Sequence, residues 1–90
     1  MNNQLQEHLT RFRVNYPLTK CIQNDNDLIY VLPTFYNASK SAVEANILIE
    51  KLNLPLVAIH RGSCSFFTVV AQDVPENWKI AITLDVHNQF

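Results

Sequence analysis

Glycine is almost absent from this chain of 90 residues, in which Gly62 is the only one. Phosphate-binding loops of the Rossmann and P-loop kinds need several glycines, because the backbone must approach the phosphate groups closely. The sequence therefore excludes nucleotide-binding folds of these two kinds. It also lacks the Gly-x-Ser-x-Gly turn that presents the nucleophile of many hydrolases, which disfavours a catalytic triad that uses Asp85 and His87. The polar alternation of these two residues is typical of a half-solvated strand.

Charged residues are also few, because they make up 17% of the chain while about 25% is usual. Asparagine and glutamine take their place, and the net charge of −1 gives no long-range attraction for nucleic acid or for an anionic membrane. We therefore expect neither nucleic acid nor a membrane as the partner. Arg11, Arg13 and Lys20 lie close in sequence, and a local basic patch there keeps a nucleic-acid-binding accessory protein as a minor alternative.

Cysteine is limited to Cys21 and Cys64, which is too few for the disulfide framework of a small secreted domain. The sequence shows no signal-peptide pattern and no apolar run long enough to span a membrane. These features predict a cytoplasmic protein that uses no cofactor and no metal. A zinc site built from both cysteines with His60 and His87 is a weaker hypothesis, because structural zinc sites usually contain close cysteine pairs.

Two helices are predicted from the spacing of apolar residues. Apolar side chains recur at helical spacing over residues 3–14, and a second helix ends at about Leu52. The segment Ser41–Glu44 has the spacing of a capping box, in which the serine and glutamate side chains each satisfy a backbone N–H group at the start of a helix. Asn37 or Ser39 could cap the same helix a little earlier.

Five strands are predicted around these helices. They cover residues 18–23, 28–32, 56–59, 65–71 and 79–87. The strand over 28–32 is apolar on both faces and should be central, whereas the strand over 79–87 alternates and should have one buried face. The order α-β-β-α-β-β-β predicts one compact α+β domain over residues 1–90, with a single mostly antiparallel sheet of about five strands and two helices. The second helix is long enough to connect one parallel pair of strands.

The second helix carries two apolar faces instead of one. One is the expected core face, and Val43 and Ile47 form a separate stripe on the far side. Either the first helix packs against this stripe or the stripe stays exposed, and the sequence leaves both arrangements open. A large exposed apolar patch on a globular protein usually marks an interaction site.

The surplus of apolar residues and the lack of a catalytic signature predict a small non-enzymatic protein-interaction module. It would act as an inhibitor, an immunity protein or an accessory protein, by occluding a surface or as a homodimer. Its partner would be another protein or a second copy of this chain. The residues predicted to contact that partner are Val43, Ile47, His60, Arg61 and Trp78.

The densest polar cluster in the chain, residues 60–64, lies between two apolar strands and suggests an alternative function. His60, Arg61 and His87 are the residue types from which a metal-independent ribonuclease takes its base, its acid and its cation. A small ribonuclease-like toxin would need the last predicted strand to bring His87 beside His60. The simpler interpretation is a hairpin connection with exposed polar side chains, and the mildly acidic composition disfavours an RNA substrate.

Overall fold

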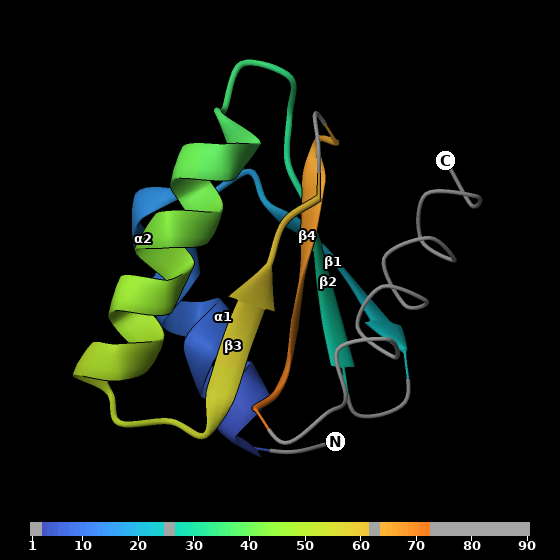
Figure 1. The fold of residues 1–90 in the computed structure, drawn as a ribbon. Helices are drawn as coiled ribbons and strands as arrows, with labels where there is room; N and C mark the ends of the chain where they lie inside the picture. The colour runs from blue at the N-terminus through green and yellow to red at the C-terminus, as the bar shows by residue number, and fades with distance from the viewer. Residues whose placement is uncertain (1–2, 25–26, 62–63, 73–90) are drawn as a thin grey trace.

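Two helices and four strands make up the described part of the chain. The computed structural model describes residues 3–24, 27–61 and 64–72. Along these ranges run α1 (Asn3–Asn15), β1 (Lys20–Asn24), β2 (Asp27–Val31), α2 (Ala38–Lys51), β3 (Leu56–Ile59) and β4 (Phe66–Ala71), as Figure 1 shows. The α+β class and the two helices are confirmed. The sheet has four strands within the described ranges rather than five, and the predicted strand over 79–87 lies outside the described residues.

The four strands form one antiparallel sheet in the order β1-β2-β4-β3. β2 therefore lies inside the sheet, as the apolar character of both its faces predicted. Leu28 of β2 and Ala58 of β3 both oppose Val69 of β4, so β4 separates the two strands that α2 connects. β2 and β3 run in the same direction, but the parallel pair that the sequence allowed is not formed within the described sheet. The short β3–β4 connection favours an antiparallel neighbour, and β4 thus takes the place between them.

The start of α2 is set by Asn37 and not by the predicted capping box. The Asn37 side-chain oxygen accepts a hydrogen bond of 3.0 Å from the backbone N–H of Lys40, so Asn37 is the N-cap. Ser41 lies inside the first turn and is buried, which corrects the capping-box prediction over Ser41–Glu44. At the other end, Asn53 adopts a left-handed φ of 54°, a conformation that asparagine tolerates at helix ends.

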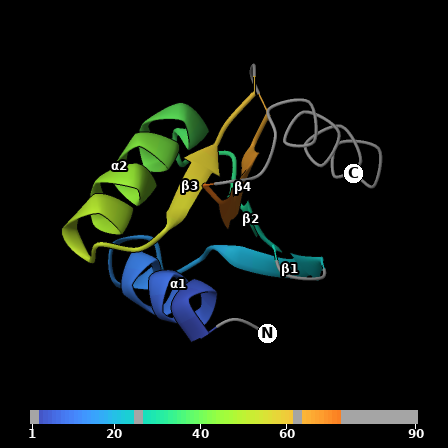
Figure 2. The same ribbon diagram turned by 60° about the horizontal axis from the view of Figure 1, so that its bottom comes forward.

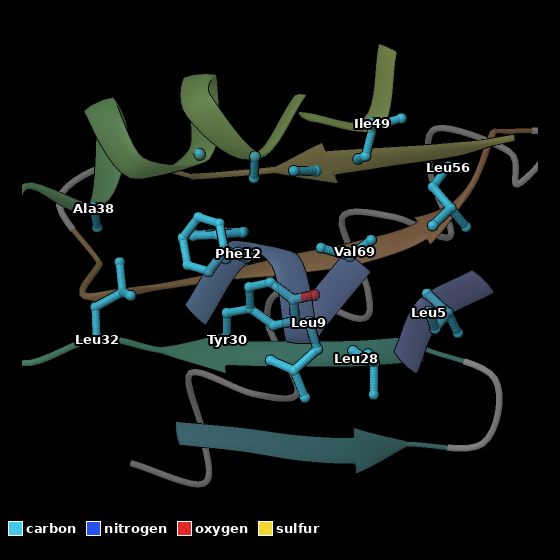
Figure 3. Close-up of a cluster of buried hydrophobic side chains, with 14 residues drawn as sticks. Leu5, Leu9, Phe12, Leu28, Tyr30, Leu32, Ala38, Ile49, Leu56 and Val69 are labelled. Carbon is cyan, nitrogen blue, oxygen red and sulfur yellow. The ribbon is translucent and has the colours of Figure 1, made fainter. Parts of the chain in front are cut away.

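Both helices lie on the same side of the sheet, as Figures 1 and 2 show from two directions. The main core lies between the helices and this face of the sheet. Three aromatic rings meet at its centre, where the ring of Phe12 lies 5.2 Å from Tyr30 and 5.5 Å from Phe67. Small residues on α2 let its backbone approach the sheet closely. The buried members, which Figure 3 draws as sticks, are Leu5, Leu9, Phe12, Leu28, Tyr30, Leu32, Ala38, Ala42, Ala45, Ile49, Leu56, Ala58, Phe67 and Val69.

The opposite face of the sheet carries a second apolar cluster. Ile29 and Phe66 are buried there, and the partly buried Ile22, Val31 and Cys64 pack against them. β2 and β4 are therefore buried on both faces, which accounts for the continuous apolar runs in their sequences.

A side-chain amide fixes α2 against β3, an edge strand of the described sheet. The Asn46 Nδ2 group donates to the carbonyl oxygen of Ala58 at 3.0 Å, and the Ala58 N–H donates to Asn46 Oδ1 at 2.8 Å. The outward backbone groups of an edge strand have no strand to pair with. Asn46 satisfies the backbone N–H and carbonyl groups of Ala58 as a neighbouring strand would. The two bonds also fix which side of α2 faces β3.

Candidate protein-binding surface

The outer side of α2 exposes the two apolar residues that the sequence singled out. Val43 is 58% exposed and Ile47 is 59% exposed, and they lie one helical turn apart. The core side of the same helix carries Ala42, Ala45 and Ile49, all of them buried. The separate apolar stripe is therefore confirmed, and the alternative in which α1 covers it is wrong.

A shallow groove of about 470 Å³ runs beside Ile47, between α2 and the end of α1. Its lining mixes aromatic, aliphatic, charged and amide side chains: Asn15, Tyr16, Glu44, Ile47, Leu48 and Lys51. The Tyr16 hydroxyl donates a hydrogen bond to the Glu44 carboxylate, so the groove wall is tied across the two helices. Desolvation, and then this hydrogen bond, raise the pKa of Tyr16 above its usual value, so the phenol remains a neutral donor.

A row of aromatic rings joins this groove to the core. Tyr16 stacks on the buried Phe12 at 4.7 Å, and Tyr36 meets Tyr16 edge-on at 5.2 Å. Phe35 lies 4.8 Å from Tyr36, but Phe35 itself is exposed. Tyr16, the one ring of this row that lines the groove, therefore packs between Phe12 on the core side and Tyr36.

The two other described residues that were predicted to contact a partner lie on a different element. His60 follows β3, and its Nε2 group donates to the Cys64 carbonyl oxygen at 2.8 Å, because a carbonyl can only accept. The side chain of His60 is half-buried and Arg61 is exposed. Figures 1 and 2 place the start of β4 at the same end of the molecule as the start of α2. Trp78 and His87 lie outside the described residues.

The geometry assigns His60 a structural part in closing the β3–β4 connection. The ribonuclease hypothesis depends on the separation of His60 and His87, and His87 is not among the described residues. The zinc hypothesis is corrected in one respect, because Cys21 packs against the main core and Cys64 against the cluster on the opposite face. One ion cannot bind both thiols across the sheet, and burial raises the pKa of Cys21.

The three basic residues predicted as a local patch, Arg11, Arg13 and Lys20, are all exposed, and one of them is held by a hydrogen bond. The Arg13 Nε group donates to the Thr19 carbonyl oxygen at 3.0 Å, which ties the end of α1 to the segment before β1. Arg11 and Lys20 are exposed. Within residues 3–24, 27–61 and 64–72, no group of three or more His, Cys, Asp or Glu side chains has the arrangement of a metal site.

Sequence reasoning found the apolar stripe but missed the groove beside it. The residues it missed are Asn15, Tyr16, Glu44, Leu48 and Lys51. Tyr16 follows Phe12 by four residues and so continues the apolar spacing of α1, which indicated that its side chain would face α2 and the core. Its bond to Glu44 joins positions 28 residues apart and depends on how the two helices pack.

No protein-family model matches this chain, and neither the curated proteins nor the solved structures include one that matches it significantly. Neither α1 nor α2, the two helices of the described part, has the length and apolar character that a membrane span requires.

Proposed function

We propose that this protein is a small non-enzymatic protein-interaction module whose binding surface is the outer side of α2. The observation that carries the proposal is the exposure of Val43 and Ile47 on a helix whose other side is fully engaged in the core. Exposed single apolar residues are common, but two on adjacent turns beside a groove form a continuous apolar surface. Because Val43 and Ile47 are 58% and 59% exposed, burying the rest of each in an interface would contribute about 1–2 kcal/mol per residue.

We propose three alternative modes of action for a module of 90 residues with this surface. The module would occlude the site of a cytoplasmic protein as an inhibitor or immunity protein, would complete a larger assembly as an accessory protein, or would act as a homodimer. His60, Arg61 and Trp78 are proposed as a second contact region. Neither nucleic acid nor a membrane is proposed as the partner, because a net charge of −1 would attract neither.

The test compares the double variant Val43→Ser/Ile47→Ser with a matched control, Val14→Ser/Leu18→Ser. Val14 and Leu18 are also exposed apolar residues, but they lie outside α2. A protein that co-purifies with the wild type from the native host would be identified and titrated calorimetrically against all three proteins. We expect the α2 variant to lose at least tenfold in affinity and the control to bind as the wild type does.

Equal binding by the α2 variant and the wild type would overturn the proposal, and so would a greater loss in the control. Thermal unfolding of all three proteins checks that a loss of affinity does not come from a loss of stability. Because the four substituted positions are exposed, we expect unfolding free energies within about 0.5 kcal/mol of the wild type.

A further inference from the structure

The outer side of α2 carries two charges in line with its two apolar residues. Lys40, Val43, Ile47 and Glu50 are all exposed, and they follow one another at intervals of three, four and three residues. This spacing places them on one stripe along the helix, as in the contact seam of a coiled coil. The stripe presents a basic end, an apolar centre and an acidic end.

We propose that the partner of this surface is a second copy of the same chain, with the two α2 helices packed antiparallel about a two-fold axis. The inference rests on the proposed function, because it uses the same binding surface. In an antiparallel pair, residues equally distant from the axis on opposite sides meet each other. Val43 and Ile47 are centred on position 45, and Lys40 and Glu50 are centred on the same position.

A single register therefore satisfies both kinds of contact. With the axis on the outer side of α2, level with position 45, Val43 of one copy meets Ile47 of the other, and Lys40 meets Glu50. Symmetry repeats each contact, so the interface contains two apolar pairs and two pairs of opposite charge. In a parallel arrangement Lys40 would face Lys40 and Glu50 would face Glu50, and the like charges would repel. The charge pattern thus selects the antiparallel arrangement.

The groove beside Ile47 fits the same arrangement. It opens next to the position that Val43 of the second copy would occupy, and its volume of about 470 Å³ leaves room for neighbouring side chains of that helix. A helix of 14 residues is about 21 Å long. One such pair buries less than the ~1,200 Å² typical of a stable interface, so we expect a weak dimer with a dissociation constant on the order of 10–100 µM.

Charge reversal tests the register directly. Lys40→Glu and Glu50→Lys would each convert both charge pairs into like-charge pairs, whereas an equimolar mixture of the two variants would restore them in a heterodimer. Sedimentation equilibrium of the wild type should show a concentration-dependent dimer. We expect each single variant to dimerise about tenfold more weakly, and the mixture and the Lys40→Glu/Glu50→Lys double variant to recover wild-type association.

The matched controls are Lys20→Glu and Glu7→Lys, which make the same changes of net charge at exposed positions outside α2. We expect both controls to dimerise as the wild type does. A wild type that stays monomeric up to 1 mM, about tenfold above the expected range, would overturn the inference. A dimer that ignores the α2 reversals, or a mixture no better than its components, would overturn it as well.

The two proposals fail in different ways. If the wild type is monomeric but Val43→Ser/Ile47→Ser still weakens a different protein partner, the homodimer is refuted and the interaction module stands. If Val43→Ser/Ile47→Ser changes neither self-association nor the binding of another protein, both proposals are refuted. Far-ultraviolet circular dichroism would confirm that each variant is folded. Should a charge variant not fold, the loss of the wild-type dimer on Val43→Ser/Ile47→Ser decides whether α2 forms the contact.

Discussion

The Nε2 atom of His8 lies 3.0 Å from the carbonyl oxygen of Ala45, and this hydrogen bond joins α1 to α2. Its Nδ1 atom lies 2.7 Å from the hydroxyl oxygen of Tyr30 on β2. The carbonyl can only accept, so Nε2 carries a proton, and in the neutral ring Nδ1 accepts from the tyrosine hydroxyl. His8 is 0% exposed and is therefore a neutral imidazole that links three elements in the core.

This buried imidazole should make the stability of the protein depend on pH. Burial lowers the pKa of His8 below its usual value of 6.5, although the bond to Ala45 opposes the shift. The unfolded state then binds more protons than the folded state as the pH falls below about 6.5. The contribution of His8 is fully present above that pH and declines by up to ~1.4 kcal/mol per pH unit until the folded pKa is reached. Urea unfolding at several pH values between 5 and 8 measures this slope.

His8→Gln is the matched control, because glutamine does not titrate. We expect this variant to be less stable at pH 7.5 and to show a smaller loss of unfolding free energy between pH 6.5 and pH 5. All other residues are the same in the two proteins, so the difference between the two curves isolates His8. Equal slopes would show that His8 binds protons equally well in both states, against the assignment of a neutral buried ring.

Removing the Tyr30 hydroxyl should destabilise the core without leaving a cavity. Tyr30→Phe keeps the ring that packs on Phe12 and Phe67 but takes away the donor to His8 Nδ1. A buried acceptor left without its donor costs about 1–3 kcal/mol. Burial raises the pKa of Tyr30, so the hydroxyl is protonated and the cost should be constant from pH 7 to pH 9. Chemical unfolding over that range tests both statements, and Tyr36→Phe, outside this network, is the control.

The amide of Asn46 should protect the edge of the sheet. Asn46→Ala removes both hydrogen bonds to Ala58, and we expect a loss of about 1–3 kcal/mol because the Ala58 groups are only partly open to water. Amide hydrogen exchange is the sharper measurement, since the Ala58 N–H should exchange much faster in the variant. Lys51→Ala, at an exposed position of the same helix, should leave that exchange unchanged. Unaltered protection of Ala58 in Asn46→Ala would contradict the role given to the amide.

Local pattern predicted both helices and the position of β2 inside the sheet, because periodicity and two-sided apolar runs depend on neighbours in sequence. It did not predict that β4 would lie between β2 and β3, since strand order depends on contacts between distant segments. The sequence offered both Asn37 and Ser41 at the start of the second helix, and the extended backbone of Asn37 with its bond to the Lys40 N–H identifies Asn37 as the N-cap. His8 shares the helical face of Leu5 and Phe12, but its polar type favoured the surface, and the partners that satisfy it in the core lie 22 and 37 residues away.

The apolar stripe of the candidate surface was predicted from the sequence, whereas the groove beside it was missed. The spacing of Val43 and Ile47 on the far side of the second helix follows from helical geometry alone. Whether that side would be exposed depended on where α1 packs, and the groove depended on the contact of Tyr16 with Glu44. A sequence read alone gives the faces of a helix but not their neighbours.

Two isoleucines on α2 provide the most direct check of which side of the helix is free. Ile47 is 59% exposed, whereas Ile49 is 3% exposed and packs in the main core. Ile47→Ala should change the free energy of unfolding by no more than about 0.5 kcal/mol, because it removes few contacts. Ile49→Ala should cost about 2–5 kcal/mol, because it removes buried methyl groups and leaves a cavity. Both helical propensity and side-chain chemistry change equally in the two variants, so only burial separates them.

Urea unfolding, at a protein concentration well below that at which any dimer forms, measures the loss of unfolding free energy in each variant. A cost above about 2 kcal/mol for Ile47→Ala would mean that the chain itself covers the stripe, and the surface on which the proposed binding depends would not be available.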